Sequence, residues 1–119
     1  MEEKKYRVAT LYKNYFADFL SSQSNKVKAK IVWVIKLIET QQTIPSEFFK
    51  HIAGTDGIYE IRVQYGSDAF RIFCFFDEGN LILLANGFKK QSQKTPKSEI
   101  KRAQKIKTEY ENEKKSNSS

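Results

Sequence analysis

The chain has 119 residues, one cysteine and a formal net charge of +7 at pH 7. This length suits one domain with one core, which we place at residues 1–111, followed by a frayed or disordered tail at 112–119. The single cysteine excludes an internal disulfide and is typical of a cytoplasmic protein. No run reaches the roughly 20 apolar residues of a membrane span, and residues 1–5 lead into no signal peptide. With one histidine as well, we expect no metal site and assign no cofactor.

The basic residues are concentrated in the last third of the chain. Residues 86–119 hold ten Lys or Arg against four Glu, which is +6 of the total charge. Such a patch favours contact with a polyanion or an acidic protein. A solvated basic helix would have the same composition, so charge alone leaves both interpretations open.

The first half of the chain predicts one strand and two helices. Alternation over residues 6–12 predicts a strand, and apolar residues at helical spacing over 15–20 predict a short helix. Ser24 is a candidate N-cap for a longer helix of about four turns. Its apolar stripe comprises Val27, Ile31, Val34, Ile35 and Ile38. Lysines occupy the other helix face, and of these we assign Lys26 and Lys30 as candidate RNA contacts.

From Gly57 the period of the apolar residues changes to two, which predicts three strands at 59–65, 69–76 and 81–87. Turn residues separate them at 66–68 and 77–80. Thr95 and Pro96 then predict the start of a last helix. The order β-α-α-β-β-β-α predicts a small α+β domain, with a mainly antiparallel sheet and helices packed on one face.

The first hairpin predicts a pair of opposed arginines. A two-residue loop at Gly66–Ser67 places Arg62 directly opposite Arg71, on the face away from the apolar residues. Opposed like charges cost up to roughly 1 kcal/mol relative to a neutral pair. Either a bound anion or the nearby Glu60 would offset this repulsion, so an anion site and a surface ion-pair network are both open. A two-residue loop at Glu78–Gly79 would place Asn86 opposite Arg71.

These residues resemble the RelE/HigB superfamily of type II toxins, in particular its phage-derived HigB-like branch. The resemblance covers roughly residues 50–104. It rests on Lys50-His51-Ile52-Ala53-Gly54, Gly57-Ile58-Tyr59-Glu60-Ile61-Arg62, Phe70-Arg71-Ile72-Phe73 and Leu83-Leu84-Ala85-Asn86-Gly87-Phe88-Lys89-Lys90, with Lys94 and Pro96. It implies a RelE-like fold and a metal-free endoribonuclease that cuts mRNA on the translating ribosome. It also implies a cognate antitoxin, often a helix-turn-helix protein.

The resemblance assigns roles to individual residues. Arg62 and Arg71 match strand positions at which the superfamily places basic catalytic or substrate-binding residues, and Lys89 and Lys90 match a basic pair after the last strand. Glu60 is a departure, because other members have a basic residue there; Phe70 is another, because tyrosine is common at its position. The general acid and base are not fixed across the superfamily.

RNA cleavage without a metal requires deprotonation of the 2′-OH, stabilisation of the phosphorane and protonation of the 5′-oxygen. Arginine suits the second task, so Arg71 and Arg62 are the first candidates. Further candidates for proton transfer or phosphate binding are Lys89, Lys90, Glu60 and the only histidine, His51. A lone histidine in a loop is more often structural. Lys94 and Lys97 complete the expected RNA contacts.

Two other functions are open at this point. A ParE-like member of the same superfold would poison DNA gyrase without cleaving RNA. A catalytically silent member would only bind RNA or protein. The presence of all four basic residues at 62, 71, 89 and 90 favours the ribosome-dependent endoribonuclease.

Overall fold

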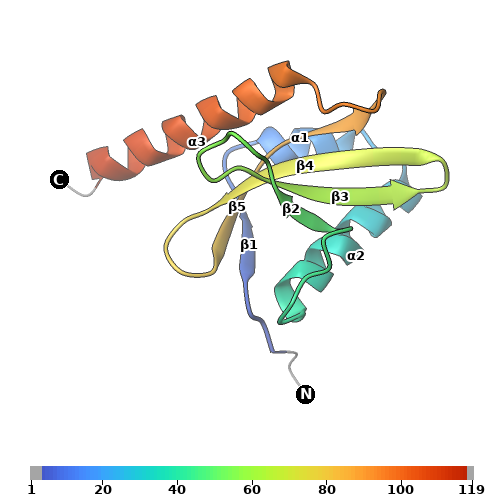
Figure 1. The fold of residues 1–119 in the computed structure, drawn as a ribbon. Coiled ribbons are helices and arrows are strands. Elements are labelled where there is room, and N and C mark those ends of the chain that lie inside the picture. Colours follow the sequence, from blue (N-terminus) through green and yellow to red (C-terminus); the bar gives the residue numbers. More distant parts are fainter. Residues whose placement is uncertain (1–3, 118–119) are drawn as a thin grey trace.

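A computed structural model describes residues 4–117 (Figure 1). Within that range the strands are β1 (Val8–Leu11), β2 (Phe49–His51), β3 (Tyr59–Tyr65), β4 (Asp68–Phe76) and β5 (Leu81–Lys90), and the helices are α1 (Tyr15–Ser21), α2 (Asn25–Thr40) and α3 (Lys97–Asn117). The strands form one sheet in the order β1-β5-β4-β3-β2. β1 pairs with β5 in parallel, and the other pairs are antiparallel. The expected α+β class is confirmed.

Helix α2 forms as its sequence predicts. The Ser24 hydroxyl accepts a hydrogen bond from the backbone N–H of Val27 at 3.3 Å, which caps the first turn. The apolar stripe is buried against the sheet, with Ile31 and Val34 fully inaccessible to solvent. This packing determines which face of α2 is exposed to solvent, and therefore which of its lysines are accessible.

Apolar side chains cover both faces of the sheet, so the expectation that all helices pack on one face is wrong. Residues of α1 and α2 form one core cluster with Ile72 and Cys74 of β4. Ala103 and Ile106 of α3 form a second cluster with Phe73 and Phe75 of the same strand. α2 and α3 lie on opposite sides of the sheet (Figure 1). Because consecutive residues of β4 are apolar, both faces of this strand need cover.

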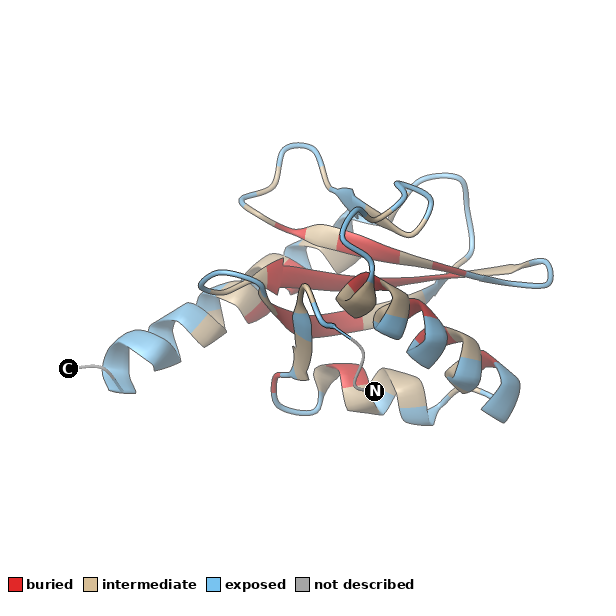
Figure 2. Cartoon of the chain, turned by 90° about the horizontal axis from the view of Figure 1, so that it is seen from below, coloured by how far each residue is buried: buried red, intermediate tan, exposed pale blue. Residues whose placement is uncertain are grey.

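Buried residues are concentrated in the central strands, while the C-terminal end of α3 projects into solvent (Figure 2). Helix α3 continues to Asn117, whereas the sequence places a frayed tail from residue 112. Lys114 explains part of this extension, since its Nζ lies 2.5 Å from Asp77 at the end of β4. Residues 118–119 lie outside the described part, as do residues 1–3. No helix between residues 4 and 117 is long and apolar enough to cross a membrane.

Strand β2 is an addition to the predicted order. Phe49–His51 pairs with β3, in a segment to which the sequence analysis assigned no strand. Three residues are too few for alternation to be recognised. His51 therefore lies in an edge strand instead of a loop.

The two hairpins differ in how well their register was predicted. The first is confirmed, with Tyr65 opposite Asp68 and Arg62 opposite Arg71. In the second, Asp77 N–H donates to Leu81 O at 2.8 Å, so the loop has three residues instead of two. A register shift between Ile72 and Cys74 follows. Together these changes overturn the predicted partner of Arg71.

Phe88, and not Asn86, lies opposite Arg71. Asn86 is buried, and its Nδ2 donates to the backbone oxygen of Glu99 at 3.1 Å and to Oε1 of Glu99 at 3.0 Å. Asn86 therefore connects β5 to the first turn of α3 and has no part in the arginine pair.

Candidate functional site

Strand pairing brings four charged side chains together on the α3 side of the sheet. They are Glu60 and Arg62 of β3, Arg71 of β4 and Lys90 of β5, and we call them the strand cluster. Arg62 and Arg71 are directly opposed. Glu60 and Lys90 share their face, because side chains two residues apart on a strand point the same way and Phe88 is the partner of Arg71.

Arg71 is buried with few partners for its guanidinium. The residue is 6% exposed, and its Nη1 donates to the backbone oxygen of Phe70 at 3.0 Å. Its Nε makes no hydrogen bond. The nearest carboxylate oxygen, Glu60 Oε2, is 3.8 Å from this nitrogen, an ion pair without a hydrogen bond. A buried donor without an acceptor costs free energy, which an oxyanion would recover.

Glu60 is the acidic member of the strand cluster. Its Oε1 lies 3.6 Å from Arg62 Nε, and Glu60 itself is buried. One carboxylate faces three cations, so the strand cluster has a formal charge of +2. Glu60 thus holds the two arginines together without neutralising them.

Lys90 is half-buried and its pKa is lowered, first by burial and then by repulsion from Arg71 and Arg62, with Glu60 opposing. The pKa of Arg71 is lowered too, by burial and then by Arg62. Both shifts mean that the folded protein disfavours its own positive charges here. A phosphate group would relieve that cost.

A cleft of about 380 Å³ opens beside the strand cluster. Its lining comprises Lys30, Glu47, Phe48, Arg62, Val63, Gln64 and Arg71. β2 begins at Phe49, so β3 has no strand partner on this edge beyond Arg62, and the cleft lies along that edge. Lys30 of α2 therefore lines the same cleft as the two arginines.

Other sequence candidates lie apart from the strand cluster. Lys89 is opposite Phe70, on the α1–α2 face, and its Nζ lies 3.4 Å from Asp68. The His51 ring packs against Tyr59 at 5.2 Å between centroids. Tyr59 belongs to the α1–α2 core, so His51 is on the wrong face to meet the arginines.

The remaining RNA-contact candidates are exposed lysines. Lys26 lies in the first turn of α2, Lys94 in the loop before α3, and Lys97 at the first position of α3. The structure gives them no contact with the strand cluster.

The sequence analysis missed Lys50 as a site residue. It pairs with Glu60, so its side chain is on the same face of the sheet as the strand cluster, and it is exposed. The signal was present, because Lys50 opens the first of the quoted motifs. Its pairing partner could not be assigned without β2.

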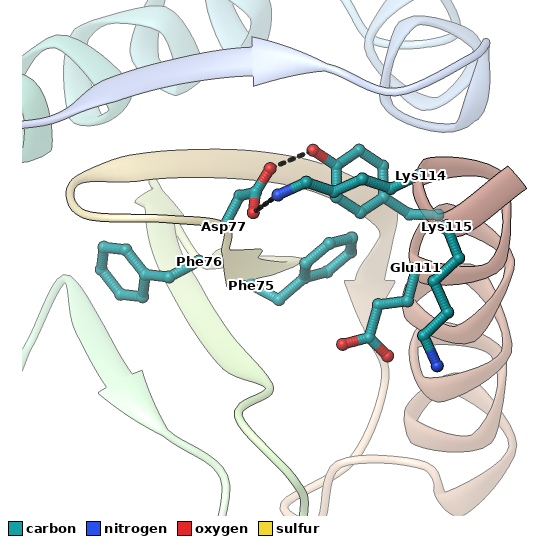
Figure 3. A pocket seen from close by; sticks show the side chains of 7 residues that line it. Phe75, Phe76, Asp77, Glu111, Lys114 and Lys115 are labelled. Atoms are coloured by element: carbon teal, nitrogen blue, oxygen red, sulfur yellow. Dashed lines mark hydrogen bonds and ion pairs between the residues drawn. The ribbon is translucent and has the colours of Figure 1, made fainter. Parts of the chain in front are cut away.

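A second cavity, of about 360 Å³, lies where the end of β4 meets α3 (Figure 3). Asp77 lies between the Tyr110 hydroxyl and the Lys114 ammonium and binds both. Because these polar groups already bind one another, we interpret the contacts of Asp77 as the anchor that holds α3 to the end of β4, and we do not assign the cavity as a substrate site.

Comparison with known proteins places the chain in a family. Residues 18–108, more than half of the chain, match the family described as "Phage derived protein Gp49-like (DUF891)". The chain belongs to this family. All members of the strand cluster and Lys50 lie inside the matched range.

Among solved structures, this Gp49-like chain is similar to a chain of the archaeal RelE–RelB complex from Pyrococcus horikoshii OT3. The TM-score is 0.48 and the sequence identity 15%, over 76% of this chain and 99% of the other. No curated protein is significantly similar to the chain.

Proposed function

We propose that this Gp49-like protein is the toxin of a type II toxin–antitoxin system and that it cleaves mRNA on the ribosome. The observation that carries the proposal is the buried, under-bonded guanidinium of Arg71 beside Arg62 and Lys90. The motifs that resemble RelE/HigB toxins contain Arg62 of β3, Arg71 of β4 and Lys90 of β5.

The proposed reaction is an internal transfer at one phosphate. The 2′-oxygen forms a bond to phosphorus, the bond between phosphorus and the 5′-oxygen breaks, and the products are a 2′,3′-cyclic phosphate and a 5′-OH. Arg71 and Arg62 stabilise the extra negative charge of the pentavalent phosphorane. One proton leaves the 2′-OH and one reaches the departing 5′-oxygen, so no oxidant or reductant is needed.

Lys90 and Glu60 are the strand-cluster residues available for proton transfer. The lowered pKa of Lys90 makes its ammonium a better acid than an ordinary lysine, which suits protonation of the 5′-oxygen. Glu60 is the nearest carboxylate, and it serves either as the base or as the counter-charge that positions Arg71.

The proposed partners are the ribosome, its mRNA and a cognate antitoxin in the cytoplasm. An antitoxin that neutralises the toxin by blocking the site would cover Arg62, Arg71 and Lys90 with acidic or apolar residues, because Lys89 lies on the opposite face of the sheet. Uncovered, the +7 charge would attract nucleic acids without selectivity. A complex that leaves all three side chains open to solvent would contradict this mode of neutralisation.

Induced expression combined with transcript-wide mapping of 5′ ends tests the function. We expect growth arrest and new 5′ ends within translated regions, and purified protein should cut mRNA on programmed ribosomes. Intact transcripts together with a DNA-damage response would instead identify a gyrase poison. Normal growth with intact transcripts would identify a silent binding module.

A further inference from the structure

Trp33, the only tryptophan, lies half in solvent on α2 although the apolar stripe of that helix is buried. It is 51% exposed. Tryptophan has one of the largest contact surfaces of any side chain and is enriched at binding interfaces, so a half-exposed indole is a candidate contact residue. Its neighbours connect it to the cleft beside the strand cluster.

Two side chains that line the cleft also contact the Trp33 ring. Lys30 Nζ lies 4.6 Å from the ring centroid, a cation–π contact. The Phe48 ring meets Trp33 edge-on, at 6.2 Å between centroids and an interplanar angle of 70°. Trp33 is thereby held at the rim of the cleft that contains Arg62 and Arg71.

The cleft combines two chemistries that a nucleotide requires. Its cationic side chains, Lys30, Arg62 and Arg71, suit a phosphate. Its rim carries an indole that is fixed in orientation and open to solvent, and unpaired bases stack on such rings. The two parts meet at Lys30, whose ammonium contacts the ring and lines the cleft.

We propose that Trp33 stacks on an unpaired base of single-stranded RNA whose phosphate binds between Lys30, Arg62 and Arg71. The proposal rests on the proposed endoribonuclease function and assigns it a base-binding residue outside the strand cluster. Trp33 is then a positioning residue, since it touches the substrate away from the reacting phosphate.

A protein partner on the same helix face is the competing occupant. Val32, next to Trp33, is 53% exposed, and an apolar partner would use both side chains. RNA stacking uses only the aromatic ring. The cation over the ring and the cationic cleft beside it favour RNA, and Val32 supplies a matched control.

Binding of a short single-stranded RNA with 2′-O-methyl riboses tests the proposal, because this RNA lacks the attacking hydroxyl. Trp33 emission reports contact directly, and the anisotropy of labelled RNA reports binding independently. We expect quenching and anisotropy to share one midpoint. Trp33→Leu should weaken binding roughly 5- to 150-fold, the range for loss of one base–aromatic stack. Lys30→Gln should weaken it too, and Val32→Ala should not.

Several results would overturn the proposal. These are unchanged Trp33 emission at saturating RNA, normal RNA affinity of Trp33→Leu, or no RNA binding by the wild-type protein. Equal losses of antitoxin affinity in Trp33→Leu and Val32→Ala, with RNA affinity unchanged, would make α2 a protein-docking surface. Cleavage of mRNA by the wild-type protein on programmed ribosomes distinguishes failure of the stacking proposal from failure of the proposed function. If the protein cleaves mRNA but RNA binding does not depend on Trp33, only the stacking proposal is wrong. If RNA binding depends on Trp33 but no mRNA is cleaved, only the proposed endoribonuclease function is wrong.

Discussion

Arg62 and Arg71 lie directly opposite each other in β3 and β4, and Glu60 is the carboxylate between them. Its two oxygens are 3.6 Å and 3.8 Å from the Nε atoms of Arg62 and Arg71. These distances permit ion pairing but leave Arg71 Nε without a hydrogen bond. Because Arg71 is buried, an oxyanion-binding role accounts for the arrangement more fully than a surface ion-pair network does.

Arg71→Ala should slow cleavage strongly and leave the fold intact. Loss of one transition-state donor costs roughly 10²- to 10³-fold in rate. The free energy of unfolding should stay within about 1 kcal/mol of wild type, because relief of the repulsion from Arg62 offsets lost packing. mRNA cleavage on programmed ribosomes and thermal unfolding measure the two effects.

Arg7 provides the matched control for Arg71. Its guanidinium donates to the backbone oxygens of Ile38, Gln41 and Gln42, at 3.1, 2.8 and 2.9 Å, and so binds the C-terminal end of α2. Arg7→Ala should lower the free energy of unfolding by about 1–3 kcal/mol, while the folded fraction cuts normally. If the effects of the two substitutions were exchanged, Arg71 would be structural and the site would lie elsewhere.

The first hairpin was predictable because its register depends on local sequence. Gly66 has a φ of 61°, which the turn requires and glycine adopts readily. Alternation on both strands then admits one register only. The opposed arginines follow from these facts, whereas the burial of Arg71 on the α3 side of the sheet does not.

The second hairpin was not predictable in the same way. Most residues of β4 and β5 are apolar on both faces, so alternation of polar and apolar residues does not fix their register. The observed register also places Asn86 where it donates to Glu99, 13 residues further along the chain, a contact that strand alternation does not predict. The strand was also expected to end at Gly87, so Lys89 and Lys90 were placed together beyond it. Because β5 continues to Lys90, the two lysines point to opposite faces.

Gly87→Ala should destabilise the protein through Phe19. A Cβ at Gly87 would lie 2.5 Å from Phe19 Cδ2, and the backbone there needs no unusual φ. Overpacking of this kind costs about 1–3 kcal/mol. Urea unfolding of Gly87→Ala, Phe19→Leu and the double variant should give a favourable coupling energy, since a smaller side chain at 19 makes room. Additive effects would show that the ring moves away freely.

Asp77 should stabilise the protein at neutral pH and lose that effect in acid. Its pKa is lowered from 3.8, first by the hydrogen bond from Lys114 and then by that from Tyr110. A lowered pKa in the folded state gives stability that is complete above the unfolded pKa and disappears as pH falls through the folded pKa. The difference in unfolding free energy between wild type and Asp77→Asn should therefore shrink below pH 3.8.

Glu78→Gln is the control for Asp77, because Glu78 also pairs with Lys114 but its side chain is 93% exposed and its Oε1 lies as far as 3.8 Å from the Lys114 ammonium. Exposed pairs contribute little. Urea titrations over a pH series should show no comparable acid dependence for this variant. Equal behaviour of the Asp77 and Glu78 variants would argue against the anchor of α3 shown in Figure 3.

Lys90 and Lys89 are neighbours in sequence but should differ sharply in function. Lys90 shares a face with Arg71, whereas Lys89 pairs with Asp68 on the opposite face. Lys90→Ala should therefore slow cleavage, by roughly 10²-fold or more if it is the general acid, and Lys89→Ala should leave the rate near wild type.

Because burial and the arginines lower the pKa of Lys90, its ammonium loses its proton at a lower pH than an exposed lysine. The wild-type rate should accordingly fall on the alkaline side. Lys90→Arg separates two roles: full activity without the alkaline fall means that the residue only binds phosphate, and low activity at every pH means that it donates the proton. If Lys89→Ala is the slower variant of the pair, the RNA lies on the α1–α2 face and the strand cluster is not the active site.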